Sequence, residues 1–143
     1  VNWARPVTVE DVRRMVPAVP QADIFRLVDS LGGRNARRAM AQLHHLLGSG
    51  NRESMGVFGM VVRQYRLLLQ AKEILEQGDT VAEISARLRL PHFVSEKICA
   101  QSRRYTIGAL EEIYRRLLVM DIAMKTGSDR QMVLDVLVAG LTL

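Results

Sequence analysis

The chain contains 143 residues, of which 48% are hydrophobic and only 5% are aromatic. This composition predicts a folded protein with an aliphatic core and excludes a disordered chain. The single cysteine, Cys99, excludes an internal disulfide framework, suits a reducing cytoplasm and is expected to be a small core side chain. No apolar run reaches the roughly 18 residues of a membrane span, and no signal segment opens the sequence, so we expect a cytoplasmic protein without membrane contact.

A surplus of basic residues gives the chain a formal net charge of +5, from 20 Lys and Arg against 15 Asp and Glu. The arginines occur in adjacent pairs: Arg13 with Arg14, Arg37 with Arg38, Arg103 with Arg104, and Arg115 with Arg116. Such pairs attract phosphate groups, but ordinary solvated helix faces carry them as well. We therefore expect any DNA binding to be weak and independent of sequence.

Helical spacing of apolar residues starts near the beginning of the chain. A short stripe, Val9, Val12 and Val16, ends at Pro17. Pro17 and Pro20 enclose a rigid break, which is the best candidate for a domain boundary. This break divides the chain into residues 1–20 and residues 21–143. Because the sequence begins at Val1 rather than methionine, we also expect it to be part of a longer protein.

Seven further helices are predicted after this break, because apolar residues recur every three or four positions between turn and cap residues. They cover residues 24–31, 36–47, 53–77, 80–88, 91–104, 106–126 and 128–141. Thr80, Thr106 and Ser128 are the predicted N-caps. Gly56 and Gly59 would weaken an isolated helix, so we expect a neighbouring helix to approach closely there. No useful strand alternation occurs, and the predicted fold class is an all-α bundle of seven to eight helices.

The helix that starts at Thr106 has the clearest pattern. Its predicted apolar stripe comprises residues 110, 113, 114, 117, 118, 122 and 124. Asp121 and Lys125 lie four apart with the acid first, so they are predicted to pair on one helix face. Gly127 is predicted to adopt the left-handed backbone conformation that often ends a helix, which we call a left-handed stop. Earlier helices are predicted to end in the same way at Gly32 and Gly33, at Gly48 and at Gly78.

Signatures of catalysis are missing from the sequence. It has no phosphate-binding glycine motif and no strand to precede one. Residues 125–127 spell the K-T-G of serine β-lactamases, but no serine is followed by lysine three positions later. Neither the histidines (His44, His45 and His92) nor Cys99 has a spacing that suits a metal site. The neighbouring carboxylates are interpreted as ion-pair partners rather than an acid–base pair: Glu111 and Glu112 with Arg115 and Arg116. We predict no catalytic site, cofactor or metal, and no ATPase or polymerase activity in this chain by itself.

Residues 80–105 resemble a helix-turn-helix, in which the second helix would enter the major groove of DNA. In that arrangement Arg103 and Arg104 would contact phosphates. Polar residues that read bases belong near the start of the second helix, where this sequence has Pro91, Phe93 and Val94. Two helices packed within a larger bundle explain the same pattern. A helix-turn-helix DNA-binding regulator is therefore kept as the alternative.

Several short patterns occur in one order along the chain. Residues 39–47 read A-x-x-x-L-x-x-L-L, residues 63–72 R-Q-x-R-x-L-L-x-x-K, residues 101–105 Q-x-R-x-Y and residues 121–127 D-x-x-x-K-x-G. Residues 83–90 read E-I-S-x-x-L-x-L, with Ser85 where alanine is usual. With residues 7–12 and 24–31, these patterns resemble the C-terminal part of the delta subunit of bacterial DNA polymerase III, a clamp-loader protein.

This resemblance implies an assembly role in DNA replication. Members of the family have a three-domain AAA+-like build without a working nucleotide site. Residues 1–20 would end the middle, or lid, domain, and residues 21–143 would form the helical collar domain. The collar would join delta to the other loader subunits, which are the ATPase gamma/tau-type and delta-prime-type subunits. Contact with the sliding clamp would belong to the first domain of the family, outside this chain.

Basic residues in the matching segments and at the arginine pairs are the candidates for contacts with partner subunits or DNA. They are Arg63, Arg66, Lys72, Arg103, Arg104, Arg115, Arg116 and Lys125. The long stems of such side chains can cover apolar surface while the charged ends reach a partner.

Overall fold

A computed structural model describes residues 21–47, 51–127 and 129–141. These residues contain seven α-helices and no strand, which confirms the predicted all-α class. The helices are α2 (Gln21–Gly32), α3 (Ala36–Leu47), α4 (Asn51–Glu76), α5 (Val81–Leu88), α6 (His92–Ser102), α7 (Ile107–Lys125) and α8 (Arg130–Leu141). The predicted first helix, the break at Pro17 and Pro20, the pair Arg13 and Arg14, and the stop at Gly48 lie outside the described residues.

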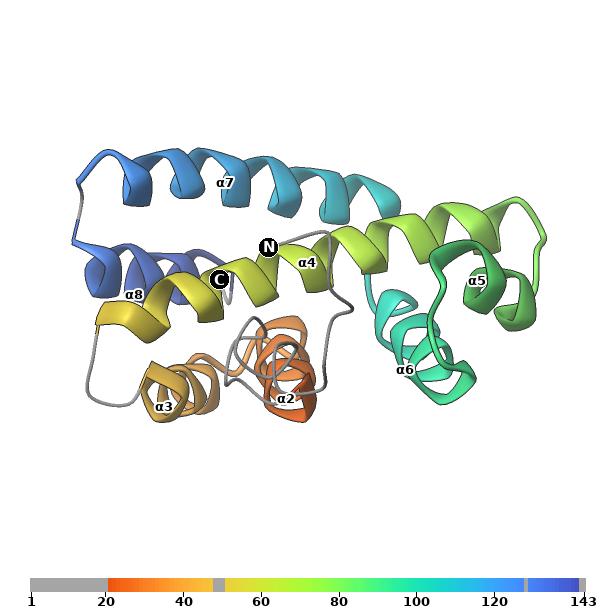
Figure 1. Cartoon of the computed structure of the whole chain (residues 1–143), viewed down its shortest axis with the longest axis horizontal. Helices are drawn as coiled ribbons and strands as arrows, with labels where there is room; N and C mark the ends of the chain where they lie inside the picture. The colour runs from red at the N-terminus through yellow and green to blue at the C-terminus, as the bar shows by residue number, and fades with distance from the viewer. Residues whose placement is uncertain (1–20, 48–50, 128, 142–143) are drawn as a thin grey trace, which may run out of the picture.

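Helix α4 is the axis of the bundle. It is 26 residues long and contacts each of the other six described helices. Figure 1 shows α7 running along one side of α4 in the opposite direction, with α8 folded back beside it. Helices α2 and α3 lie on the other side of α4, and α5 and α6 pack near its C-terminal end. The helix that carries the pattern of residues 63–72 therefore organises the whole domain.

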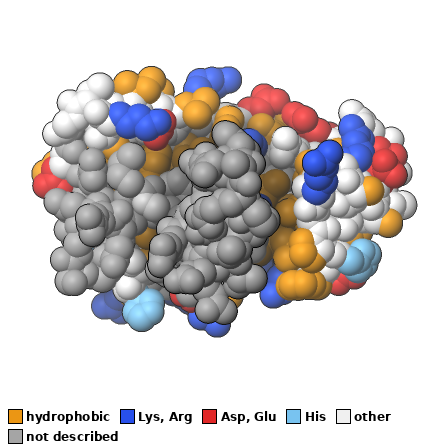
Figure 2. Space-filling model, in the orientation of Figure 1, with side chains coloured by type: hydrophobic (Ala, Val, Ile, Leu, Met, Phe, Trp, Pro, Cys, Tyr) orange, Lys and Arg blue, Asp and Glu red, His pale blue; other side chains and the backbone are white. Residues whose placement is uncertain are grey.

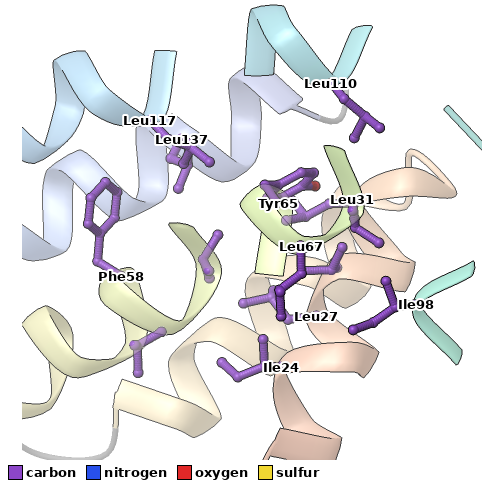
Figure 3. Close-up of a cluster of buried hydrophobic side chains, with 14 of the residues drawn as sticks. Ile24, Leu27, Leu31, Phe58, Tyr65, Leu67, Ile98, Leu110, Leu117 and Leu137 are labelled. Atoms are coloured by element: carbon purple, nitrogen blue, oxygen red, sulfur yellow. The ribbon is translucent and has the colours of Figure 1, made fainter. Parts of the chain in front are cut away.

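The core forms where the surrounding helices meet α4. Phe58 and Tyr65, its largest side chains, are 1% and 0% exposed. Figure 3 shows them among aliphatic side chains that come from α2, α6, α7 and α8, including Leu27, Ile98 and Leu117. Burying each such side chain contributes roughly 1.5–3 kcal/mol before the entropy cost of ordering it. The predicted core position of the cysteine is confirmed, because Cys99 is 1% exposed.

Local hydrogen bonds define the helix ends. The hydroxyls of Thr80 and Thr106 each accept a hydrogen bond from the backbone N–H three residues later, at 3.3 and 3.1 Å, and both predicted N-caps are confirmed. The cap predicted at Ser128 lies outside the described residues. Asp129 accepts the equivalent bond at the start of α8, at 3.1 Å. Side-chain caps of this kind satisfy N–H groups that the helix itself leaves without partners.

Left-handed residues stop several helices. Gly78 and Gly127 have φ angles of 90° and 102°, so these two predicted stops are confirmed. Helix α2 ends at Gly32, as predicted, but the left-handed residue that follows it is Arg34, with φ 56°, and not a glycine. The N–H groups of residues 34 and 35 close this stop on the carbonyls of residues 31 and 30, at 3.1 and 3.0 Å. These bonds satisfy the last carbonyls of α2 and hold an arginine in a conformation that usually favours glycine.

Close approach occurs at a glycine for which it was not predicted. A Cβ atom added at Gly59 would meet nothing within 4 Å, so the prediction of a neighbouring helix is wrong there, and at Gly56 it stays a prediction. At Gly32 the added atom would lie 2.7 Å from the hydroxyl oxygen of Tyr105. That oxygen is 3.2 Å from the hydroxyl oxygen of Tyr65 in the core. Gly32 therefore leaves room for a tyrosine pair that joins the end of α2 to α4.

The apolar stripe of α7 is narrower than predicted. Leu110, Leu117 and Met124, spaced by seven residues, are at most 2% exposed. Leu118 and Ile122, which were predicted to share this stripe, are 45% and 63% exposed. The reason is that α7 packs on α4 and α8 along one side only, so the flanks of its apolar surface face solvent.

Candidate interaction surfaces

Five large apolar side chains remain exposed on the α7–α8 hairpin. Leu118, Val119 and Ile122 of α7 are 45%, 64% and 63% exposed, and Met132 and Val136 of α8 are 64% and 56% exposed. They are five of the six large apolar side chains exposed in the described residues, they belong to two helices that pack against each other, and we call them together the α7–α8 apolar surface. In Figure 2, hydrophobic side chains reach the surface along the edge where Figure 1 places α7. Apolar side chains gathered in this way mark protein interfaces more often than scattered single ones do.

Charged side chains on the same helix, α7, form ion pairs with one another. Glu112 binds both Arg115, at 2.6 Å, and Arg116, at 3.2 Å. Lys125 binds Asp121 at 2.8 Å, as predicted. Because the basic side chains in these pairs are 54–69% exposed, each pair contributes at most about 1 kcal/mol to folding. Three of the eight predicted contact residues are thus held in ion pairs on α7, where their three positive charges face two carboxylates.

The other five predicted contact residues belong to two parts of the fold, helix α4 and the turn after α6. Arg66 is exposed, while Arg63 and Lys72 are half-buried along α4. Arg103 and Arg104 are exposed in the turn after α6, where Arg104 lies 3.7 Å from Asp29. Within the described part of the chain, only Arg115 and Arg116 share a partner. No common basic patch of all eight is formed, and their roles in binding stay predictions.

A groove between α2 and α6 was missed by the sequence reasoning. It encloses about 380 Å³, and we call it the α2–α6 groove. Its lining residues recur at helical spacing on both walls: Ala22, Phe25, Arg26 and Asp29 from α2, and Lys97, Ala100, Gln101 and Arg104 from α6 and the turn that follows. The spacing i, i+3, i+4, i+7 on each helix could have indicated two facing stripes. Their meeting depends on packing that no local pattern encodes.

A buried amide network forms the floor of this groove. Gln101 is 4% exposed, and its amide nitrogen donates to the Asp29 carboxylate at 2.6 Å and to the Phe25 carbonyl at 3.2 Å. Its amide oxygen accepts from Gln64, which is 1% exposed, at 2.8 Å. No buried side-chain nitrogen or oxygen in the described residues lacks a hydrogen-bond partner. The network therefore joins α2, α4 and α6 and leaves its polar atoms satisfied.

The buried ionisable side chains are in their neutral forms at neutral pH. Burial raises the pKa of Tyr65 well above its ordinary value, and the adjacent Tyr105 raises it further. Burial also raises the pKa of Tyr105 and of the Cys99 thiol, against the opposing effects of Arg104 and Arg103. In the described residues, no group of three or more His, Cys, Asp or Glu is placed to hold a metal ion. No helix in that part of the chain is long and apolar enough to span a membrane.

Helix α6 does not present a surface for reading DNA. Its buried side chains, which include Val94, Ser95 and Ile98, pack it into the bundle. At its start His92 lies 2.9 Å from Glu96 across one turn, so both side chains already have partners. Phe93, which was predicted to pack inside, is 63% exposed. The first turn of α6 therefore has no polar side chain without a partner that could read bases, and the helix-turn-helix alternative is not supported.

Comparisons with known proteins agree on one family. The family described as "DNA polymerase III delta subunit, C-terminal domain" matches residues 21–141. The chain is 30% identical over 130 residues to the DNA polymerase III subunit delta of Bacillus subtilis, covering 90% of this chain and 37% of that protein. Its fold is similar to that of a solved Bacillus subtilis DNA clamp loader delta protein, with a TM-score of 0.81 and 29% identity, covering 95% of this chain and 40% of the other. The chain thus spans about two fifths of the length of these relatives.

Proposed function

Because this chain belongs to the C-terminal domain family of the DNA polymerase III delta subunit, we propose that it is the collar module of a bacterial clamp loader. In this role residues 21–143 form a rigid helical block that joins delta to the gamma/tau-type and delta-prime-type subunits. Residues 1–20 are the end of the preceding lid domain. The clamp loader would act in the bacterial cytoplasm, where it places sliding clamps on DNA during replication.

The α7–α8 apolar surface is the observation that carries this proposal. Its five side chains are 45–64% exposed, although α7 and α8 are otherwise well packed on α4. Full burial of one such side chain is worth roughly 1.5–3 kcal/mol, so covering the exposed half contributes about 1 kcal/mol per residue. Together these residues supply a substantial part of the free energy of a subunit interface. The paired charges of α7 suit the polar border of such an interface.

The proposed module acts without chemistry of its own. Arg115, Arg116 and Lys125 of α7 are paired with carboxylates of the same helix, and Cys99, the buried Tyr65 and the half-buried Tyr105 are neutral. What the chain offers to partners is shape, apolar surface and charge. A stiff collar of this kind lets nucleotide-driven movements of the ATPase subunits act against a fixed point.

A binding experiment with purified subunits tests the proposal. The chain is titrated with a gamma/tau-type ATPase subunit and, separately, with the sliding clamp. The variants Val119→Asp and Ile122→Asp introduce charge into the α7–α8 apolar surface, and Phe93→Asp is the matched control at another exposed apolar residue. Each surface variant is expected to weaken binding to the ATPase subunit about tenfold, because roughly 1.4 kcal/mol of apolar contact or more is lost. The control should bind like the unaltered chain.

Two outcomes would overturn the proposal. One is tight binding to the sliding clamp together with no binding to any other loader subunit. The other is equal weakening by Phe93→Asp and by the surface variants, which would place the interface elsewhere. The same preparation should not hydrolyse ATP, and hydrolysis that disappears when a basic residue of this chain is changed would contradict the non-enzymatic role.

A further inference from the structure

The α2–α6 groove lies on the opposite side of α4 from α7 (Figure 1) and has a different chemistry from the α7–α8 apolar surface. We infer that this groove binds a short acidic segment of a partner polypeptide, with one large apolar side chain inserted between the two helices. The inference does not depend on the proposed collar interface, because the two surfaces share no residue.

The floor of the groove is closed to polar ligands. Both hydrogens of the Gln101 amide nitrogen are used, on the Asp29 carboxylate and the Phe25 carbonyl, and its oxygen is used by Gln64. A ligand that placed a phosphate or a carboxylate on this floor would find no free donor there. The uncharged part of the remaining lining consists of the half-buried Phe25 and the small side chains Ala22 and Ala100. These groups favour an apolar side chain.

The rim of the groove is positively charged. Arg26, Lys97 and Arg104 line it with Asp29, and Arg26 is also paired at 3.1 Å with Asp23, the residue next to the groove-lining Ala22 on α2, so three positive charges face two carboxylates, an excess of one. Asp29 is already engaged by Gln101 and lies 3.7 Å from Arg104. The Lys97 ammonium lies 5.9 Å from the centre of the Phe25 ring and has no carboxylate partner among the described residues. The rim therefore attracts carboxylates on either side of an apolar anchor.

A second hollow continues this path around the end of α2. It encloses about 350 Å³ and shares Arg26, Asp29 and Arg104 with the groove, to which it adds Arg38. Arg38 lies in the first turn of α3, where the helix dipole disfavours a positive charge by a few tenths of a kcal/mol or more. An acidic segment that runs past this turn would relieve that repulsion. The α2 wall of the groove, residues 22–29, is about 10 Å long at the rise of an α-helix, room for about three extended residues.

A nucleic acid fits these observations less well than a peptide. A phosphate backbone has no apolar side chain for the space beside Phe25 and Ala100, and its phosphate oxygens offer the Asp29 carboxylate no hydrogen-bond donor. A peptide can place its anchor beside Phe25 and keep its own backbone N–H groups near Asp29. Oligonucleotides therefore serve as the competing probe in the test.

The test uses the full chain and fluorescent synthetic peptides in which one leucine or phenylalanine is flanked by aspartates and glutamates. The comparison probes replace the apolar residue by serine, replace the acids by lysine, or are single-stranded oligonucleotides of equal charge. Lys97→Glu reverses one rim charge, Ala100→Trp fills the groove without changing charge, and Arg66→Glu is the matched charge reversal on α4 outside it. Circular dichroism checks that each variant keeps its helix content.

We expect binding of the acidic peptides to weaken about tenfold in Lys97→Glu and Ala100→Trp and to stay unchanged in Arg66→Glu. Loss of the apolar residue should weaken binding to a similar extent, and the lysine peptides should not bind. The inference is overturned if no acidic peptide binds, if all three variants bind alike, or if the oligonucleotide binds more tightly than every peptide and loses that affinity in Lys97→Glu.

Discussion

The buried glutamine pair offers the sharpest test of how this domain is held together. Gln64 and Gln101 are 1% and 4% exposed, and they are joined by one hydrogen bond of 2.8 Å. Gln101→Leu keeps a similar volume but removes that bond and the donors to Phe25 and Asp29. The Gln64 amide is then buried without its partner, which costs about 1–3 kcal/mol, and the two lost donor bonds cost about 1 kcal/mol each at most. We expect Gln101→Leu to lower the free energy of unfolding by about 2–4 kcal/mol.

The double variant Gln64→Leu with Gln101→Leu separates the two contributions. It removes the orphaned amide and replaces it with an apolar side chain, so it should be more stable than Gln101→Leu by about 1–3 kcal/mol. Urea denaturation followed by far-ultraviolet circular dichroism measures each free energy, and an unchanged dependence on urea concentration checks that the unfolding transitions are comparable. The single variant Gln64→Leu completes the comparison. A double variant whose loss of stability equals the sum of the losses in Gln64→Leu and in Gln101→Leu would refute the reasoning, since it would show that the amides do not depend on each other.

Three further predictions concern individual positions. Leu117→Ala should destabilise the chain by about 2–5 kcal/mol and Leu118→Ala by less than about 1 kcal/mol, because only the first side chain is in the core. Urea denaturation measures both losses of stability, and equal losses would contradict the assigned orientation of α7. Arg89→Gly should be neutral or stabilising by up to about 1 kcal/mol, while Gly127→Ala should cost about 1 kcal/mol, because both positions have positive φ. Thermal melting compares the two variants, and a lower melting temperature for Arg89→Gly than for Gly127→Ala would contradict the left-handed conformation at these helix ends. Because the folded pKa values of Cys99, Tyr65 and Tyr105 are raised above 9.0, 10.0 and 10.0, the unfolded chain loses these protons first, and stability that is complete at neutral pH should fall as pH rises through these ordinary values. Denaturation across the alkaline range tests this, and a Tyr65→Phe variant with an equally steep fall would argue against a contribution from the tyrosine pair.

Local sequence patterns determined where the helices are and how they end. The hydroxyls of Thr80 and Thr106 cap helices as predicted, and Gly78 and Gly127 stop them. The pair of Asp121 and Lys125 formed as predicted. These features depend on residues within one or two turns of each other, so their physics is contained in a short stretch of chain. The ordered motifs also led to the family, which the match over residues 21–141 confirms.

Tertiary structure decided which sides of the helices are covered. Leu117 and Leu118 are neighbours with equal hydrophobicity, yet one is 0% and the other 45% exposed, because only one faces α4 and α8. Apolar side chains that pack in the core and those that face solvent follow the same helical spacing, so the sequence could not separate the core from the α7–α8 apolar surface.

Contacts between segments that are distant in the chain could not be predicted from the sequence either. Gln64 and Gln101 are separated by 37 residues, and Gln101 and Asp29 by 72, so no local pattern shows that these polar groups satisfy one another. The buried network and the α2–α6 groove exist because α4 holds α2 and α6 beside each other. The sequence by itself determined an all-α chain of one family, and packing around α4 determined which residues that chain presents to partners.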